Sequence, residues 1–126
     1  MSTTESRSLF TGAPSGIVPY IAIVGALVST YVHLSMAPMI MQFDSTQGVL
    51  FVLAGLGFLG GIAIYLTRYW RREFYLVAVV FALAQIVAWA VMGARINEMA
   101  LLSKGGEAIF AVTAGYLYRR DAGSSE

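Results

Sequence analysis

Five polar residues lie within or beside long apolar segments and have side chains that could bind a ligand or carry a proton. They are His33, which is the only histidine, Gln85, Arg95, Lys104 and Glu107. Imidazole titrates near neutral pH, and a carboxylate among apolar residues needs a charged or hydrogen-bonding partner. Lys104 and Glu107 are three residues apart, so they share one face of a helix. We expect His33 to contact Glu107, with Lys104 or Arg95 balancing the charge.

Two interpretations of this polar cluster stay open. As a functional site, it would bind a small polar ligand or pass protons. As a structural site, it would fasten the first apolar segment to the last. Gln85 lies deeper in its segment, where water is absent, so its amide is expected to form an interhelical hydrogen bond. Asp44 is expected at the same level as His33 and is interpreted as a loop residue or a helix N-cap.

Metal and haem chemistry have few ligands available in this chain. There is no cysteine, which removes thiolate and iron–sulfur sites. His33 with Met36, Met39 and Met41 would suit Cu(I), and a haem would need His33 from two copies. The alternative is a structural histidine at a helix end. The sequence also lacks a phosphate-binding glycine loop, an HExxH motif and a nucleophile elbow. We therefore predict no catalytic residue, no metal, no cofactor and no enzymatic activity.

The composition indicates a protein surrounded by lipid. Apolar residues make up 58% of the 126 residues and charged residues only 12%, about half the usual share for a soluble domain. The apolar residues are collected in long blocks, as in membrane-spanning segments. The net charge is only +1, and no basic arm is present, so no nucleic-acid partner is expected.

Four membrane spans are predicted between polar tails at residues 1–16 and 119–126. The spans cover approximately residues 17–37, 48–67, 74–93 and 101–118. A helix of about 20 residues matches a hydrocarbon core of about 30 Å. Pro38 is expected to end the first helix. The fourth span is the weakest, because it contains Lys104, Glu107 and the pair Gly105-Gly106. Ser103 capping a shorter span, or a helical hairpin lying on the membrane surface, are the alternatives.

The distribution of basic residues predicts the orientation. With the N-terminus inside, the inner segments hold six lysine or arginine residues and the outer loops hold only Arg95 and Lys104. Because cytoplasmic segments carry an excess of these residues, both termini are predicted to be cytoplasmic, in a multi-pass protein of the cell membrane.

Small residues on each span predict how the helices associate. Lipid does not drive helices together by hydrophobicity, so close backbone approach and polar contacts must do so. The second span has Gly57-x-x-x-Gly61. Small or polar residues also recur at helical spacing on the other three spans, at Ala22, Ala26, Thr30, His33 and Ala37, at Ala78, Ala82, Gln85 and Trp89, and at Glu107, Ala111, Ala114 and Tyr118. The predicted fold is an all-α, integral membrane, antiparallel four-helix bundle.

The stretch GVLFVLAGLGFLGGIAIYLTRYWRREFYLVAVVFALAQIVAW resembles a group of small, uncharacterised four-span integral membrane proteins, best represented among halophilic archaea. Members share a histidine near the end of the first span, a second span of the type GVLF-L-G-GFL and a basic second hairpin turn. The resemblance extends over residues 17–120. It implies a four-span membrane protein, and it carries no catalytic residues to this chain.

The leading functional prediction is a non-enzymatic accessory or structural subunit of a membrane complex, because packing signals are abundant and chemical groups are few. One alternative is a small oligomeric transporter or channel lined by His33, Gln85 and Glu107. Another is a haem- or copper-binding redox accessory protein that uses His33. The expected partners are the lipid bilayer and either another membrane protein or further copies of the chain.

Overall fold

The chain folds into four helices in a computed structural model that describes residues 9–122. The helices are α1 (Val18–Met41), α2 (Ser45–Tyr65), α3 (Glu73–Val91) and α4 (Glu98–Arg120). Within the described residues the only β-type pairing is an isolated bridge between Phe10 and Thr67. The prediction of an all-α, four-helix fold is therefore confirmed.

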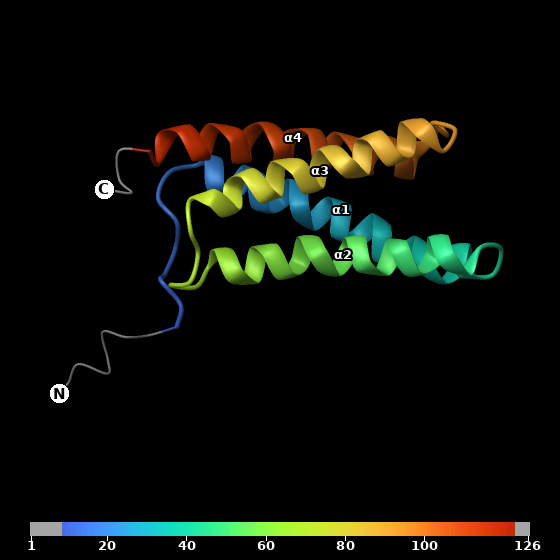
Figure 1. Cartoon of the computed structure of the whole chain (residues 1–126), viewed down its shortest axis with the longest axis horizontal. Coiled ribbons are helices and arrows are strands. Elements are labelled where there is room, and N and C mark those ends of the chain that lie inside the picture. Colours follow the sequence, from blue (N-terminus) through green and yellow to red (C-terminus); the bar gives the residue numbers. More distant parts are fainter. Residues whose placement is uncertain (1–8, 123–126) are drawn as a thin grey trace.

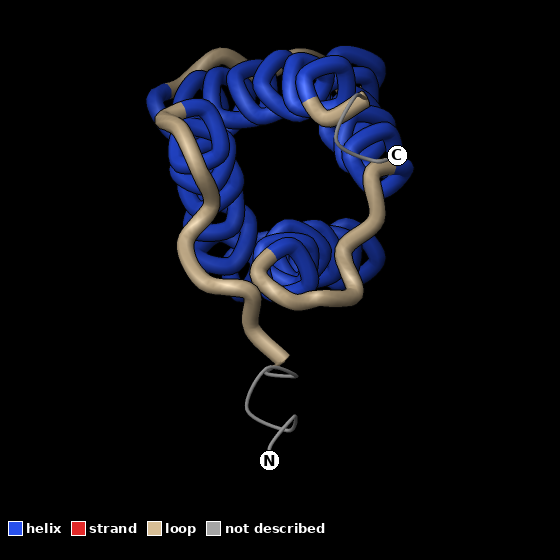
Figure 2. Tube along the Cα trace, turned by 90° about the vertical axis from the view of Figure 1, so that its left-hand side faces the viewer, coloured by secondary structure: helices blue, strands red, loops and turns tan. Residues whose placement is uncertain are grey.

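Consecutive helices run antiparallel along one long axis (Figure 1). The α1–α2 and α3–α4 loops lie at one end, which we call the loop end. The α2–α3 link, the start of α1 and the end of α4 lie at the other, which we call the tail end. Helix α1 packs against α2 and α4, and α3 packs against α4. Seen along the axis, the four helices stand around a ring (Figure 2).

Aromatic side chains fill the space between the four helices. Phe58 of α2 is buried, and its ring centroid lies 4.8 Å from that of Phe81 on α3 and 5.4 Å from that of Phe110 on α4. Ala26 and Ala82 pack around these rings and are fully buried. Both alanines belong to the small-residue faces predicted from the sequence. Aromatic side chains thus bridge α2 and α3, while small residues let α1 and α3 approach the centre.

The prediction that Pro38 ends the first helix was wrong, because α1 continues to Met41 with Pro38 inside it. Proline lacks the N–H that would bond to the carbonyl of Leu34, so it removes one hydrogen bond from a helix. Here it lies in the last turn, and the residues after it can still bond to earlier carbonyls. The loss of that single bond is small enough for the helix to continue.

Side chains cap the helices that begin at the loop end. The Asp44 side chain accepts a hydrogen bond from the Gln47 amide at 3.1 Å, which confirms its interpretation as an N-cap of α2. The Asn97 side chain caps α4 by accepting from the Ala100 amide at 2.9 Å. Helix α4 therefore begins earlier than expected and runs without a break through Gly105 and Gly106. Neither a cap at Ser103 nor a helical hairpin is present in this described part of the chain.

Three of the helices are long and apolar enough to cross a membrane, namely α1 with 24 residues, α2 with 21 and α3 with 19. Helix α4 has 23 residues but a lower hydropathy, because it includes Lys104 and Glu107. The outer face of α3 is apolar, with Val77, Val80 and Val87 each about 60% exposed (63%, 66% and 59%). An extended exposed apolar face is typical of a surface that contacts lipid or another protein.

A close contact between α1 and α4 is made by two glycines that lie outside the predicted small-residue faces. A Cβ atom on Gly25 would lie 2.7 Å from the carbonyl oxygen of Gly106, so the backbones of α1 and α4 touch here. A Cβ atom on Gly57 would lie 2.6 Å from Cζ of the Phe81 ring. Gly57 therefore allows the close packing that was predicted for it. A Cβ on Gly61 would meet nothing within 4 Å, so its predicted role in close helix packing was wrong.

Candidate functional site

A completely buried carboxylate lies at the contact between α1 and α4. Glu107 has no exposed surface, and it follows Gly106 at the place where the two helices touch. One carboxylate oxygen, Oε2, accepts hydrogen bonds from the hydroxyls of Ser29 at 2.6 Å and Ser103 at 2.9 Å. The other, Oε1, lies 2.6 Å from the ammonium nitrogen of Lys104. These groups replace the water that a carboxylate otherwise needs.

His33 lies beside this carboxylate, as expected from the sequence. Its Nε2 atom is 3.8 Å from Glu107 Oε2, and the residue is only 4% exposed. The Nδ1–H group donates to the backbone carbonyl of Ser29 at 2.8 Å, which fixes the tautomer and the ring orientation. The ring packs against Phe51, with 4.9 Å between the ring centroids. His33 therefore faces Glu107 from inside the bundle.

Lys104 connects the cluster to α3. Its ammonium donates to the backbone carbonyl of Gln85 at 3.3 Å, while the same nitrogen pairs with Glu107. The side chain is 15% exposed, so the charge lies close to the edge of the bundle. The predicted interhelical hydrogen bond of the Gln85 side-chain amide is not found among the described residues, where the backbone carbonyl of Gln85 accepts the bond from Lys104 instead.

The structure does not bring Arg95 or Asp44 to the cluster. Arg95 is exposed in the α3–α4 loop, where its backbone carbonyl accepts a hydrogen bond from the indole of Trp89 at 2.9 Å. Asp44 caps α2 beyond the end of α1. The expectation that they share the level of His33 and Glu107 was wrong. Because α1 and α4 extend further toward the loop end than predicted, the cluster lies deeper than the loops.

Ser29 and Ser103 are the site residues that sequence reasoning missed. Each lies four residues before an ionisable residue, Ser29 before His33 and Ser103 before Glu107, so each shares a helix face with it. That spacing was visible in the sequence. Ser29 also lies near the middle of α1, 11 residues after its start and 12 before its end. The cluster thus extends to the centre of the bundle, about 17 Å from either end of α1.

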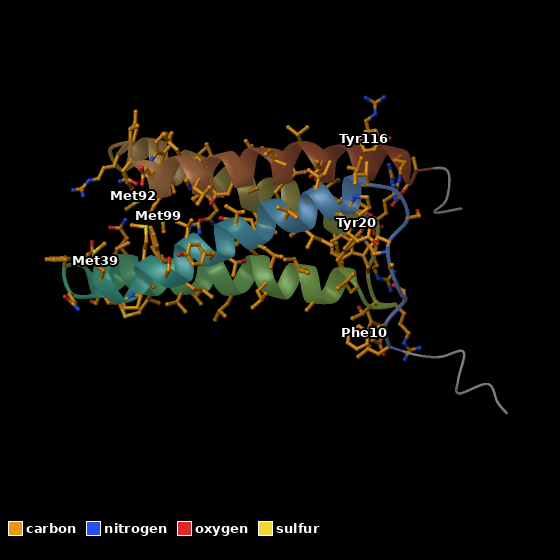
Figure 3. All side chains as sticks on the ribbon, turned by 180° about the vertical axis from the view of Figure 1, so that it is seen from behind. Phe10, Tyr20, Met39, Met92, Met99 and Tyr116 are labelled. Atoms are coloured by element: carbon orange, nitrogen blue, oxygen red, sulfur yellow. The ribbon has the colours of Figure 1, made fainter. Side chains whose placement is uncertain are left out.

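The ionisable groups of the cluster could exchange a proton or neutralise one another, whereas they are less suited to binding a metal ion. Within residues 9–122, no three histidine, aspartate or glutamate residues are close enough to share a metal ion. Met39 is 53% exposed and lies at the loop end, as do Met92 and Met99 (Figure 3). A porphyrin bound to His33 Nε2 would have to enter between this atom and Glu107 Oε2, which are 3.8 Å apart. The geometry gives no support to a copper or haem site at His33.

Together these features define a class of protein: an all-α four-helix bundle with three helices apolar enough to cross a membrane and a buried ionisable cluster between α1 and α4. The chain belongs to the family described as "Family of unknown function (DUF7475)", whose model matches residues 4–118. No curated protein and no solved structure matches the chain.

Proposed function

We propose that this protein is a multi-pass protein of the cell membrane, with all four helices crossing the bilayer and both termini in the cytoplasm. Helices α1, α2 and α3 support this by length and composition. Helix α4 accompanies them because its Ser103 and Glu107 are turned inward and paired, while its exposed face carries Leu101, Ile109 and Val112. The described ends of the first and last helices lie together at the tail end, where the arginines are concentrated.

Within that membrane, the role that the geometry favours is a non-enzymatic accessory or structural subunit of a larger complex. The observation that carries this proposal is the closure of the polar cluster. Every group that holds Glu107 comes from this chain, and the carboxylate has no exposed surface. Oε1 has its ion pair with Lys104 and no hydrogen bond within residues 9–122, and Oε2 bonds to Ser29, so the cluster connects α4 to α1 and, through Lys104, to α3. Buried polar clusters of this kind favour one helix packing over others. The apolar outer faces remain for lipid and for a partner.

Native purification tests this role. The tagged chain is extracted from its own membrane in a mild detergent, and the mass and composition of the particle are measured. We expect one further membrane protein in fixed stoichiometry. Gly60→Leu on α2 and Gly115→Leu on α4 are matched probes of the outer faces, because a Cβ at either position meets nothing within 4 Å. We expect each variant to fold and the one that lies in the interface to lose the partner. Recovery of the chain alone, as a monodisperse monomer or homo-oligomer, would contradict the accessory role.

A small oligomeric transporter or channel is the second candidate. It is favoured by one observation, the row of ionisable and polar groups from His33 through Glu107 and Lys104 to the carbonyl of Gln85. Intramembrane ionisable groups in contact often form proton relays. We expect Glu107→Gln to abolish any proton flux into liposomes, while Asp44→Asn, outside the cluster, leaves it unchanged. Flux that survives the combined loss of His33 and Glu107 would exclude this path.

A further inference from the structure

An open groove follows the line where α1 and α4 pack together, and we call it the α1–α4 groove. Its volume is about 510 Å³, which is the size of many ligand-binding sites. Glycines form its floor and leave the space above the backbone empty, while its walls are mostly branched apolar side chains. The lining includes Ile17, Ile21, Val24, Leu102, Gly105 and Ile109. The five apolar side chains among these are 41–70% exposed, so the groove opens to the surroundings of the protein.

The groove extends over about half the length of the bundle. On the α1 side its lining runs from Ile17, just before the helix, to Val28, which is 11 residues further on. At about 1.5 Å per residue this distance is about 16 Å, roughly half of a hydrocarbon core of about 30 Å. The groove thus begins at the tail end and ends near the middle of the bundle. Its length matches one chain of a lipid in a single leaflet.

A basic side chain lies at the tail-end mouth of this groove. The Arg120 guanidinium donates through Nη1 to the Ser15 carbonyl at 3.3 Å, two residues before Ile17. Its Nε atom pairs with Asp121 Oδ1 at 2.8 Å, which helps to hold the group in place. Arg120 is also 18 residues, or about five helical turns, after Leu102, so both lie on the same side of α4. The guanidinium is therefore beside the end of the apolar lining.

The tail end as a whole is positively charged. Its described residues include five arginines but only two acids, namely Arg68, Arg71, Arg72, Arg119 and Arg120 against Glu73 and Asp121. Clusters of basic residues beside membrane-spanning helices attract anionic lipids. A phosphate group at the mouth of the groove would therefore meet positive charge.

A helix of another protein is the other candidate occupant of an apolar groove. A membrane-spanning helix is about 10–12 Å across and runs through the whole hydrocarbon core. The α1–α4 groove follows only about half of that distance, and its mouth is beside a charged guanidinium. Covering that charge with a helix would cost solvation energy, whereas a lipid phosphate compensates it. Both the length and the charge favour a lipid.

We propose that the α1–α4 groove binds an anionic phospholipid, with one acyl chain along the glycine floor and the phosphate beside Arg120. The chain fills the space that the missing side chains of Gly105 and Gly106 leave, and the phosphate accepts hydrogen bonds from the guanidinium, which has five N–H donors. This inference rests on the proposed membrane insertion. With the tail end at the cytoplasmic side, the lipid belongs to the inner leaflet.

Native mass spectrometry of the intact chain, in the detergent tetraethylene glycol monooctyl ether, measures the binding. The protein is titrated with dioleoylphosphatidylglycerol and, separately, with dioleoylphosphatidylcholine, which has the same chains but no net charge. We expect one phosphatidylglycerol per chain to bind saturably, with about tenfold higher affinity than phosphatidylcholine. Equal affinities, or further copies added without saturation, would overturn the proposal.

Two glycine variants test whether a lipid chain occupies the groove. Gly105→Leu places a side chain in the groove at a position where a Cβ meets nothing within 4 Å, so the fold should be retained. This variant should bind both lipids about tenfold more weakly. Gly115→Leu is the matched control, because it is on the same helix, has equal room and does not line the groove. Circular dichroism verifies that both are folded, and equal lipid affinities in the two variants would refute occupancy of the groove.

Two arginine variants test the headgroup. Arg120→Gln removes the charge at the mouth, so the preference for phosphatidylglycerol should fall to about one while phosphatidylcholine binds as before. Arg71→Gln removes an exposed charge at the same end of the molecule, in the α2–α3 link and outside the groove, and should retain the preference. An equal loss in both variants would mean that the lipid responds only to the overall charge, which would overturn the proposal.

Failure of lipid binding and failure of the proposed function give different results. Binding in detergent does not depend on orientation, so its failure would leave the four-span topology standing, and an inverted topology would move the lipid to the outer leaflet. If Gly105→Leu removes a co-purified membrane protein and leaves the lipid affinity unchanged, the groove binds a partner helix and the proposal is overturned.

Discussion

Glu107 shows at the residue scale how a charge can be buried in this bundle. Two hydroxyls and one ammonium surround its carboxylate, and each of these side chains comes from α1 or α4. The contact with His33 could be expected from the sequence because both ionisable residues lie in apolar segments and need partners. The two serines could also have been recognised from their i, i+4 spacing. The exclusion of Arg95 could not, because the length of α4 decides how far the α3–α4 loop lies from Glu107.

Removing one partner of the buried pair should be costly, and removing both less so. In Glu107→Gln the ammonium of Lys104 loses its counter-charge in a site where it is only 15% exposed, so we expect a loss of about 3–5 kcal/mol. Adding Lys104→Met should restore part of that loss. Unfolding in mixed SDS and dodecyl maltoside micelles measures the four proteins of the cycle. Purely additive effects would show that the pair contributes no coupling.

The Ser29 hydroxyl should contribute measurably to the same cluster. In Ser29→Ala, Glu107 Oε2 loses a hydrogen bond of 2.6 Å to a side chain with no exposed surface. Hydrogen bonds to charged groups contribute about 1.5–3 kcal/mol, and we expect a loss of that size. Ser35→Ala is the matched control on the same helix, because that hydroxyl, on an exposed residue, bonds to the Val32 carbonyl of its own helix. The same micelle titration should show a change within about 0.5 kcal/mol for the control.

At the scale of the elements, the contact of α1 with α4 was the least predictable feature. The sequence indicates which face of a span carries small residues, and Ala26, Ala82 and Ala111 are indeed buried. A pair of glycines at this spacing, however, does not indicate which other helix will pack against it. Gly57 and Gly61 have the motif spacing, yet only Gly57 meets a neighbour, and that neighbour is a side chain. The glycines of the α1–α4 crossing are far apart in the sequence, so only the fold reveals that they touch.

Adding a methyl group at this crossing should force the two helices apart. In Gly25→Ala the new Cβ would lie 2.7 Å from the Gly106 carbonyl oxygen, and backbone atoms cannot move aside as a flexible side chain can. We expect a loss of about 1–3 kcal/mol, as for other overpacked sites. Gly105→Ala is the control, because its Cβ would meet nothing within 4 Å and alanine favours a helix. The control should be neutral or more stable in the same titration, and equal losses in both variants would contradict the crossing.

At the scale of the whole molecule, side chains of different kinds are separated along the long axis. Tyr20 and Tyr116 lie toward the tail end, and Met39, Met92 and Met99 lie at the loop end (Figure 3). The tail end also holds the segment before α1, where the Arg68 amide donates to the Leu9 carbonyl at 2.9 Å. Part of what the sequence presents as a polar tail is thus tied to the α2–α3 link. Hydropathy alone does not reveal such pairing, because it depends on where the link lies in space.

The proposed orientation gives the final prediction, which the absence of cysteine makes simple to test. Phe43→Cys places a thiol in the α1–α2 loop at a residue that is 84% exposed, and Ser124→Cys places one near the C-terminus, outside the described residues. With both termini cytoplasmic, a membrane-impermeant maleimide added to intact cells should label the Phe43→Cys variant, whereas Ser124→Cys should react only after the membrane is opened. The reverse pattern would invert the protein in the membrane. Labelling of both variants in intact cells would mean that the helices cross an odd number of times, and α4 would then lie outside the bilayer.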